Sequence, residues 1–260
     1  MGLVEIYRKK LRRYSDMIKA IIFDKDGTII DLGNTWDEPT VGAMDIMLQL
    51  TDLSDEDKIV FKKKMGVEAT SIVPNSLVAA GSIHDQSVFL SQVIPLPVSE
   101  IELKLEQLYY DFISAPEVSL NIVADVESVL SELKEKYFLG LVTNDNRRIT
   151  EATLNKTGLI KYFDYVASAD EFKPKPDPSA LYDLQAKHGF DFDEMIYVGD
   201  SSVDMIYGKL TQAAIGLALE PSHLEHLKEA DYVVEGFKEL PALLEKISSE
   251  RKDKPNNEKI

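Results

Sequence analysis

The feature of this chain that most restricts its fold is a series of short apolar runs that lack polar alternation and are separated by helical patterns. Runs of this kind are typical of strands in a parallel sheet, because such strands are buried on both faces. The expected strands lie at residues 20–24, 138–143, 165–168, 195–199, 213–219 and 232–234. Segments with helical spacing alternate with them after residue 117. The sequence therefore predicts an α/β fold, with a Rossmann-like parallel sheet as the core and helices on both of its faces.

Between the first two expected strands lies a stretch of helical periodicity. Apolar residues recur at three- and four-residue spacing in 37–50, 54–67, 83–93 and 99–114, as expected for amphipathic helices. This pattern predicts an all-helical domain inserted after the first strand. The expected organisation is a basic N-terminal extension at 1–16, an α/β core at 17–32 and 117–250, the helical insert at 33–116 and a polar tail at 251–260.

Composition narrows the classes of function. The 45 acidic and 29 basic residues among 260 give a formal net charge of −16, which disfavours a nucleic-acid surface. The absence of cysteine excludes thiol nucleophiles, thiolate metal sites and disulfides. No apolar run reaches the length of about eighteen residues that suggests a membrane span, and residues 1–19 lack the apolar segment of a secretory signal. We therefore expect a cytoplasmic protein whose partner is a small molecule. The sequence indicates neither its oligomeric state nor the role of residues 1–16.

Polar side chains follow the expected strands at their carboxyl ends, where ligands bind in open parallel sheets. The candidate site residues are Asp24, Asp26, Thr143, Asn144, Lys173, Lys175, Asp200 and Asp204. Crowded carboxylates repel one another, and a hard divalent cation with oxygen ligands offsets that cost. Mg²⁺ fits best, because it binds through a few carboxylates together with substrate phosphate. The chemistry that remains is that of a carboxylate nucleophile with an acid/base partner, hydroxyl and amide donors, and a metal.

Four segments carry a resemblance to a known family. They are Asp24-Lys25-Asp26-Gly27-Thr28, Val142-Thr143-Asn144, Lys173-Pro174-Lys175-Pro176-Asp177 and Gly199-Asp200-Ser201-Ser202-Val203-Asp204. In this order they resemble the four motifs of the haloacid dehalogenase-like (HAD) superfamily. The resemblance covers residues 17–32 and 117–247. A core with a helical insert is similar to the phosphoglycolate phosphatase-like branch, whose insert is a helical cap.

The resemblance implies a phosphatase mechanism. Asp24 would attack phosphorus and form an aspartyl-phosphate, and Asp26 would act as general acid and then as general base. The resemblance also implies that Mg²⁺ is held by Asp24, the Asp26 carbonyl, Asp200 and Asp204, the last directly or through water. It implies that the phosphate is held by Thr143, the Asn144 amide and Lys173.

The sequence leaves open which of two lysines holds the phosphate. The family pattern Lys-Pro-x-Pro-Asp aligns Lys173, which we therefore favour, but Lys175 lies two residues further on and could reach the same side. Lys25 should point away from its two neighbouring aspartates by strand alternation. Trp36, where the chain enters the helical insert, is expected to serve in packing.

The expected substrate is a small phosphorylated metabolite, and phosphoglycolate is only a family-level suggestion. Asp26 favours phosphoester chemistry, because dehalogenases and phosphonatases of this class lack that second carboxylate. A phosphomutase of the same superfamily is an alternative, disfavoured because residues 33–116 contain no arginine to hold a second phosphate. A degenerate, non-catalytic phosphate-binding member is another, disfavoured because Asp24, Asp26, Lys173 and Asp200 are all present.

Overall fold

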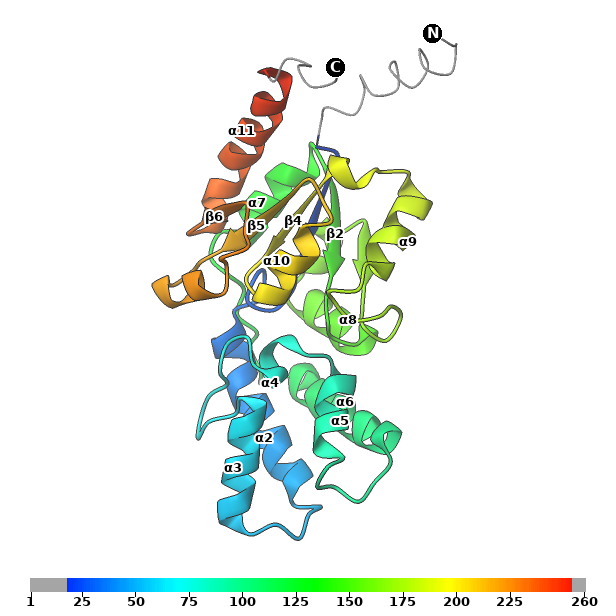
Figure 1. Ribbon diagram of the computed structural model, residues 1–260, viewed down its shortest axis with the longest axis vertical. Coiled ribbons are helices and arrows are strands. Elements are labelled where there is room, and N and C mark those ends of the chain that lie inside the picture. Colours follow the sequence, from blue (N-terminus) through cyan, green and yellow to red (C-terminus); the bar gives the residue numbers. More distant parts are fainter. Residues whose placement is uncertain (1–17, 254–260) are drawn as a thin grey trace, which may run out of the picture.

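The computed structural model describes residues 18–253; the extension at 1–16 and residues 254–260 of the expected tail lie outside the described residues. The described part is built on a six-stranded parallel sheet with the order β3-β2-β1-β4-β5-β6 (Figure 1). The strands are β1 Ala20–Phe23, β2 Phe138–Val142, β3 Tyr165–Ala167, β4 Met195–Gly199, β5 Ala213–Leu217 and β6 Tyr232–Val234. The α/β prediction is thereby confirmed. No helix among residues 18–253 is both long and apolar enough to cross a membrane.

Strand β1 lies in the middle of the sheet, between β2 and β4. Phe23 at its end pairs with Leu141 of β2 and with Val198 of β4. All four residues of β1 are buried, which explains the absence of polar alternation in this run. Because the three strands run parallel and end at the same level, the residues that follow them meet at one edge of the sheet.

Helices cover both faces of the sheet. One face packs against α7 Val126–Lys134, α8 Arg147–Lys156 and α11 Leu240–Asp253. The other packs against α9 Ser179–His188 and α10 Ser202–Gly208. Short 3₁₀ turns complete the connections at Leu159–Tyr162, Phe192–Glu194, Pro221–Glu225 and Phe237–Glu239. Each face therefore has its own apolar core.

The remaining helices form a group, here called the helical unit, around an apolar core that also takes in Ile149 of α8. Its members are α2 Leu32–Leu48, α3 Asp55–Met65, α4 Leu77–Ala80, α5 Ile83–Leu90 and α6 Val98–Ser114. The sequence explains the limits of α3, since the Ser54 side chain accepts from the Asp57 amide at the start and Gly66 ends the helix with φ +90°. Figure 1 places the unit beyond the edge of the sheet at which β1, β2 and β4 end.

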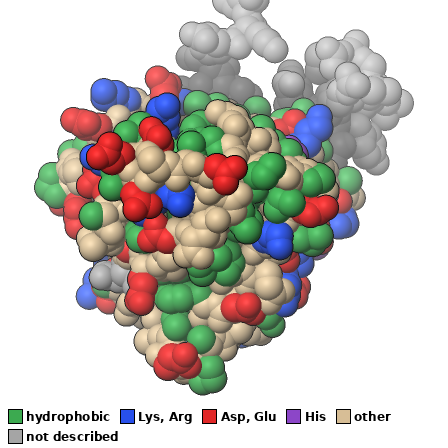
Figure 2. Space-filling view, turned by 90° about the horizontal axis from the view of Figure 1, so that it is seen from below, with side chains coloured by type: hydrophobic (Ala, Val, Ile, Leu, Met, Phe, Trp, Pro, Cys, Tyr) green, Lys and Arg blue, Asp and Glu red, His purple; other side chains and the backbone are tan. Residues whose placement is uncertain are grey.

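Several polar contacts join the helical unit to the core. The Ser202 amide donates to Asn75 Oδ1 at 2.9 Å, and Asn144 Nδ2 donates to the Ala80 carbonyl at 2.9 Å. Asn146 Nδ2 donates to Glu106 at 2.8 Å. The helical unit is therefore closed onto the sheet edge. Seen from below, the molecule presents acidic side chains with hydrophobic ones between them (Figure 2).

Candidate active site

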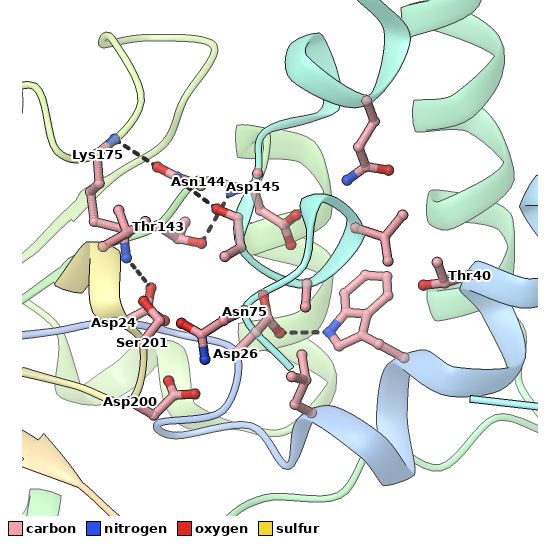
Figure 3. Close-up of a pocket in the computed structure, with 18 of the residues that line it drawn as sticks. Asp24, Asp26, Thr40, Asn75, Thr143, Asn144, Asp145, Lys175, Asp200 and Ser201 are labelled. Carbon is pink, nitrogen blue, oxygen red and sulfur yellow. Dashed lines mark hydrogen bonds and ion pairs between the residues drawn. The ribbon is translucent and has the colours of Figure 1, made fainter. Parts of the chain in front are cut away.

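A pocket lies between the carboxyl edge of the sheet and the helical unit (Figure 3). Its cavity measures about 50 Å³. The core contributes Asp24, Asp26, Thr143, Asn144, Asp145, Lys175, Asp200 and Ser201. Segments that are far apart in the sequence thus meet at one place, because the strands that precede them end together.

Asp24 and Lys175 form the centre of the pocket. Lys175 Nζ lies 2.5 Å from Asp24 Oδ1 and 2.7 Å from Asp204 Oδ1, and it donates to Tyr197 Oη at 3.0 Å. Burial alone would lower the pKa of Lys175, but the charges of Asp204 and Asp24 outweigh it and raise the pKa. Burial and the Asp204 charge raise the pKa of Asp24 to about 7, against the opposing effect of Lys175. Lys175 is therefore a fixed cation beside a carboxylate that is costly to ionise without further positive charge.

Lys173, which we favoured from the sequence, is not part of this pocket. Its side chain is 79% exposed, and its nearest acidic partner is Asp177 at 3.8 Å. The Lys-Pro-x-Pro pattern occurs twice in overlap, starting at Lys173 and at Lys175. The second copy directly precedes α9, whose first residue is Ser179. Lys175 is thus also followed by Pro-x-Pro, so the Lys-Pro-x-Pro part of the pattern that favoured Lys173 fits Lys175 equally well.

Asp200 approaches the turn after β1 closely. A Cβ atom on Gly27 would lie 2.1 Å from Asp200 Oδ2, and Gly27 has φ +81°, so only glycine fits there. The Thr28 hydroxyl donates to Asp200 Oδ1 at 2.9 Å. Burial, followed by the charges of Asp204 and Asp24, raises the pKa of Asp200 well above its usual value. This point of the pocket therefore has an excess of negative charge.

A divalent cation fits that excess. Carboxylate oxygens of Asp24, Asp200 and Asp204 lie within 4.8 Å of one another. They are hard oxygen donors, the type that magnesium and calcium prefer. The residues present thus suit a hard divalent ion, held at the edge of the sheet next to Asp24.

Asp204 is buried more deeply than a residue that only binds a metal ion needs to be, since 1% of its side chain is exposed. Its Oδ1 accepts from Lys175 and from the Tyr197 hydroxyl at 2.9 Å, and its Oδ2 accepts from the amide and hydroxyl of Ser201. Burial acts to raise the pKa of Asp204, but Lys175 and these hydrogen bonds outweigh it and lower the pKa. The contacts favour a role in holding Lys175 in position.

Thr143 and Asn144 both line the pocket, as the sequence predicted. The Thr143 hydroxyl accepts from the Asp145 amide at 3.1 Å. The Asn144 side chain accepts from the Lys175 amide at 2.7 Å through Oδ1. The loop after β2 therefore positions the loop that carries Lys175. Through the hydrogen bond from Asn144 to the Ala80 carbonyl, it also contacts the helical unit.

A buried charge cluster around Asp26 escaped the sequence analysis. Lys25 is wholly buried, and its Nζ lies 2.6 Å from Asp26 Oδ2 and 2.7 Å from Asp145 Oδ2. Our expectation that Lys25 points away from Asp26 was therefore wrong. Trp36 packs edge-on against Tyr109, and its Nε1 also donates to Asp26 Oδ1 at 2.6 Å. Burial raises the pKa of Asp145 to about 6, although Lys25 opposes the shift.

Replacing Lys25 by Met should lower the free energy of unfolding by about 3–5 kcal/mol, because it leaves the largely buried carboxylates of Asp26 and Asp145 without their cation. Lys134→Met is the matched control. That lysine pairs with Asp164 at 2.5 Å where both side chains are about one-third exposed, so its loss should cost about 0–1 kcal/mol. Urea unfolding of both variants measures the difference. Equal, small losses would contradict the importance of the Lys25 pairs.

Comparison with known proteins identifies the family of this chain. The family model described as haloacid dehalogenase-like hydrolase matches residues 21–217. The phosphoglycolate phosphatase of Vibrio parahaemolyticus is 29% identical over 230 residues, which cover 86% of this chain and 94% of that protein. The pyrophosphatase PpaX of Bacillus velezensis is 33% identical over 128 residues, which cover 46% of this chain and 59% of that protein.

Solved structures share the fold. A predicted phosphoglycolate phosphatase from Haemophilus somnus aligns with a TM-score of 0.65 at 17% identity, over 88% of this chain and 98% of that one. CbbY from Rhodobacter sphaeroides in complex with phosphate also gives a TM-score of 0.65, at 19% identity, over 86% and 96% of the two chains. Since the family model spans most of the sequence and the curated relatives are phosphatases, the chain belongs to the haloacid dehalogenase-like hydrolases and is a phosphatase of that superfamily.

Proposed function

We propose that the protein is a Mg²⁺-dependent phosphomonoester hydrolase that acts on a small phosphorylated metabolite through an aspartyl-phosphate intermediate. The observation that carries the proposal is the Asp24 carboxylate, which faces the pocket beside Lys175 and near Asp200 (Figure 3). A carboxylate with a fixed lysine next to it suits a nucleophile that must approach a phosphate dianion. The relatives named phosphoglycolate phosphatase and pyrophosphatase support a phosphate-bearing substrate.

In the first step, an oxygen of Asp24 attacks phosphorus while the ester P–O bond breaks, and Asp26 gives a proton to the leaving alcohol oxygen. In the second, Asp26 takes a proton from water, and that water releases phosphate from Asp24. The Thr143 hydroxyl, the Asn144 amide and the Lys175 ammonium hold the phosphoryl oxygens. Lys175 replaces Lys173 in this role because only Lys175 lines the pocket.

Asp26 must carry a proton in the first step and lose it afterwards. Both of its oxygens are in contact here, Oδ1 with Trp36 Nε1 and Oδ2 with Lys25 Nζ. When Asp26 is protonated, Lys25 keeps Asp145 as its charged partner. The buried lysine can therefore remain paired throughout the two steps.

The metal would be held by Asp24, the Asp26 carbonyl and Asp200, with Asp204 behind them. When bound, Mg²⁺ supplies positive charge that screens the nucleophile and the phosphate from each other. We assign residues 17–32 and 117–250 to the catalytic core and 33–116 to a cap. In that role the helical unit excludes water and contacts the leaving group.

Metal removal tests the proposal. With p-nitrophenyl phosphate as substrate, chelation by EDTA should lower kcat by at least about 100-fold, since a bound metal supplies several kcal/mol of transition-state stabilisation. Adding excess Mg²⁺ should restore the rate. Undiminished hydrolysis in EDTA, or no hydrolysis with Mg²⁺, would count against a magnesium-dependent phosphatase.

A further inference from the structure

The wall of the pocket that faces the leaving group is built from uncharged side chains. Among the described residues, each one that the helical unit contributes to the pocket is aliphatic, aromatic, hydroxyl or amide in character. The polar and aromatic members of this wall are Trp36, Thr40, Asn75, Gln86 and Tyr109. Tyr109 donates to Gln86 Oε1 at 3.0 Å, so the two form a fixed polar surface in this wall. Such a surface offers hydrogen bonds to hydroxyl groups but no counter-ion.

The core adds negative charge next to this wall. Asp145 follows the phosphate-holding pair Thr143 and Asn144 and lines the same pocket (Figure 3). Its Oδ2 contacts Lys25, and its side chain retains 21% exposure. Lys25 itself is wholly buried beneath the pocket between Asp145 and Asp26, so it is not free to meet a ligand. Lys175, the cation that does line the pocket, is engaged with Asp24 and Asp204.

An anionic leaving group would therefore lie near Asp145 without a cation of its own, since Lys25 and Lys175 are both engaged with carboxylates. Like charges a few ångströms apart in a partly buried site repel strongly. A carboxylate or a second phosphate on the leaving group is therefore disfavoured by charge.

We propose that this pocket discriminates against phosphate esters whose leaving group is anionic, and that Asp145 is the residue that rejects such leaving groups. The proposal rests on the phosphomonoesterase function proposed above. It separates this chain from relatives named for phosphoglycolate, whose leaving group carries a carboxylate.

The test ranks kcat/KM for three esters with Mg²⁺: glycerol 1-phosphate, whose leaving group is neutral; 2-phosphoglycolate, whose leaving group is anionic; and O-phosphoethanolamine, whose leaving group is cationic. Glycerol 1-phosphate should exceed 2-phosphoglycolate by about tenfold or more, the ratio that a single unfavourable charge contact produces. A higher kcat/KM for 2-phosphoglycolate than for glycerol 1-phosphate or O-phosphoethanolamine would overturn the proposal.

The Asp145→Asn variant tests whether Asp145 is the residue that rejects anionic leaving groups. The variant should raise kcat/KM for 2-phosphoglycolate relative to glycerol 1-phosphate by about five- to tenfold, because it removes the repelling charge at nearly constant shape. Asp52→Asn changes net charge equally at an exposed position outside the pocket and should leave the ratio unchanged. An unchanged ratio in Asp145→Asn would exclude Asp145 as the selecting residue.

Hydrolysis of p-nitrophenyl phosphate shows whether a negative result concerns the selectivity proposal alone or the phosphatase proposal as well. If wild type hydrolyses it with Mg²⁺ but prefers 2-phosphoglycolate, the selectivity proposal fails and the phosphatase proposal stands. If no ester is hydrolysed, the phosphatase proposal fails and the selectivity proposal with it. The ranking on wild type does not depend on the folding of any variant.

Discussion

Asp24→Asn is expected to lower kcat for every phosphate ester by about 10³-fold or more, because an amide cannot attack phosphorus as a carboxylate does. Acid-quenched wild type should carry covalent phosphate on the fragment that contains Asp24, and the variant should carry none. Intact-protein and peptide mass spectrometry after mixing with substrate measure both. A variant that retains a tenth of wild-type kcat would remove Asp24 as the nucleophile.

The Asp24→Asn variant should also fold well, which makes the result interpretable. Burial and Asp204 raise the pKa of Asp24 to about 7 in the metal-free protein. A carboxyl group whose folded pKa is raised destabilises the fold as pH rises through its unfolded value, and the deficit is complete above the folded pKa. The neutral amide escapes this cost, so at pH 8 without metal the variant should be at least as stable as wild type. Urea unfolding provides the check, and Asp52→Asn, exposed and outside the pocket, is the matched aspartate control.

Lys175→Met should lower kcat/KM by about 10²–10³-fold, because it removes a fixed positive charge from the developing charge on the phosphoryl group. Lys173→Met should change kcat/KM by less than about threefold, since that side chain is 79% exposed and an exposed ion pair contributes little. Steady-state kinetics with saturating Mg²⁺ compares them. A larger loss in Lys173→Met would return the phosphate-holding role to Lys173.

A loss in Lys175→Met must be distinguished from unfolding, because Asp24 and Asp204 would be left buried without their lysine. Lys175→Arg provides the distinction. It keeps the positive charge near both carboxylates but cannot reproduce the compact ammonium between them. We expect it to recover most of the thermal stability and little of the activity. Recovery of both would mean that charge alone, and not its placement, matters at this position.

The sequence predicted the sheet well because its strands carry a local signal. A run such as Ala20–Phe23 is buried on both faces, so every residue in it is apolar. Once these strands are parallel neighbours, the residues after them must meet, which is why Asp24, Thr143 and Asp200 were found. The shared edge follows from general rules of α/β folds, whereas the order of the strands was not predicted and is known from the structure.

The sequence did not predict the direction of side chains whose position depends on tertiary contacts. Strand alternation assigns Lys25 to the side away from its neighbours, but the chain has left the strand at Phe23 and turns there. Its long side chain then reaches Asp145, which belongs to a loop more than a hundred residues away. The short helix Leu77–Ala80 lacks a full helical repeat and gave no periodic signal.

The separation of the pocket's members along the chain has a consequence for biosynthesis. Asp24 and Lys175 are 151 positions apart, and Thr28 and Asp200 are 172 apart. The central strand β1 gains its second neighbour only when β4 has been translated, so a nascent chain that stops before β4 lacks one wall of the pocket. A chain that stops before β4 also lacks Asp200 and Asp204, so we expect such a fragment to be unable to hydrolyse phosphate esters.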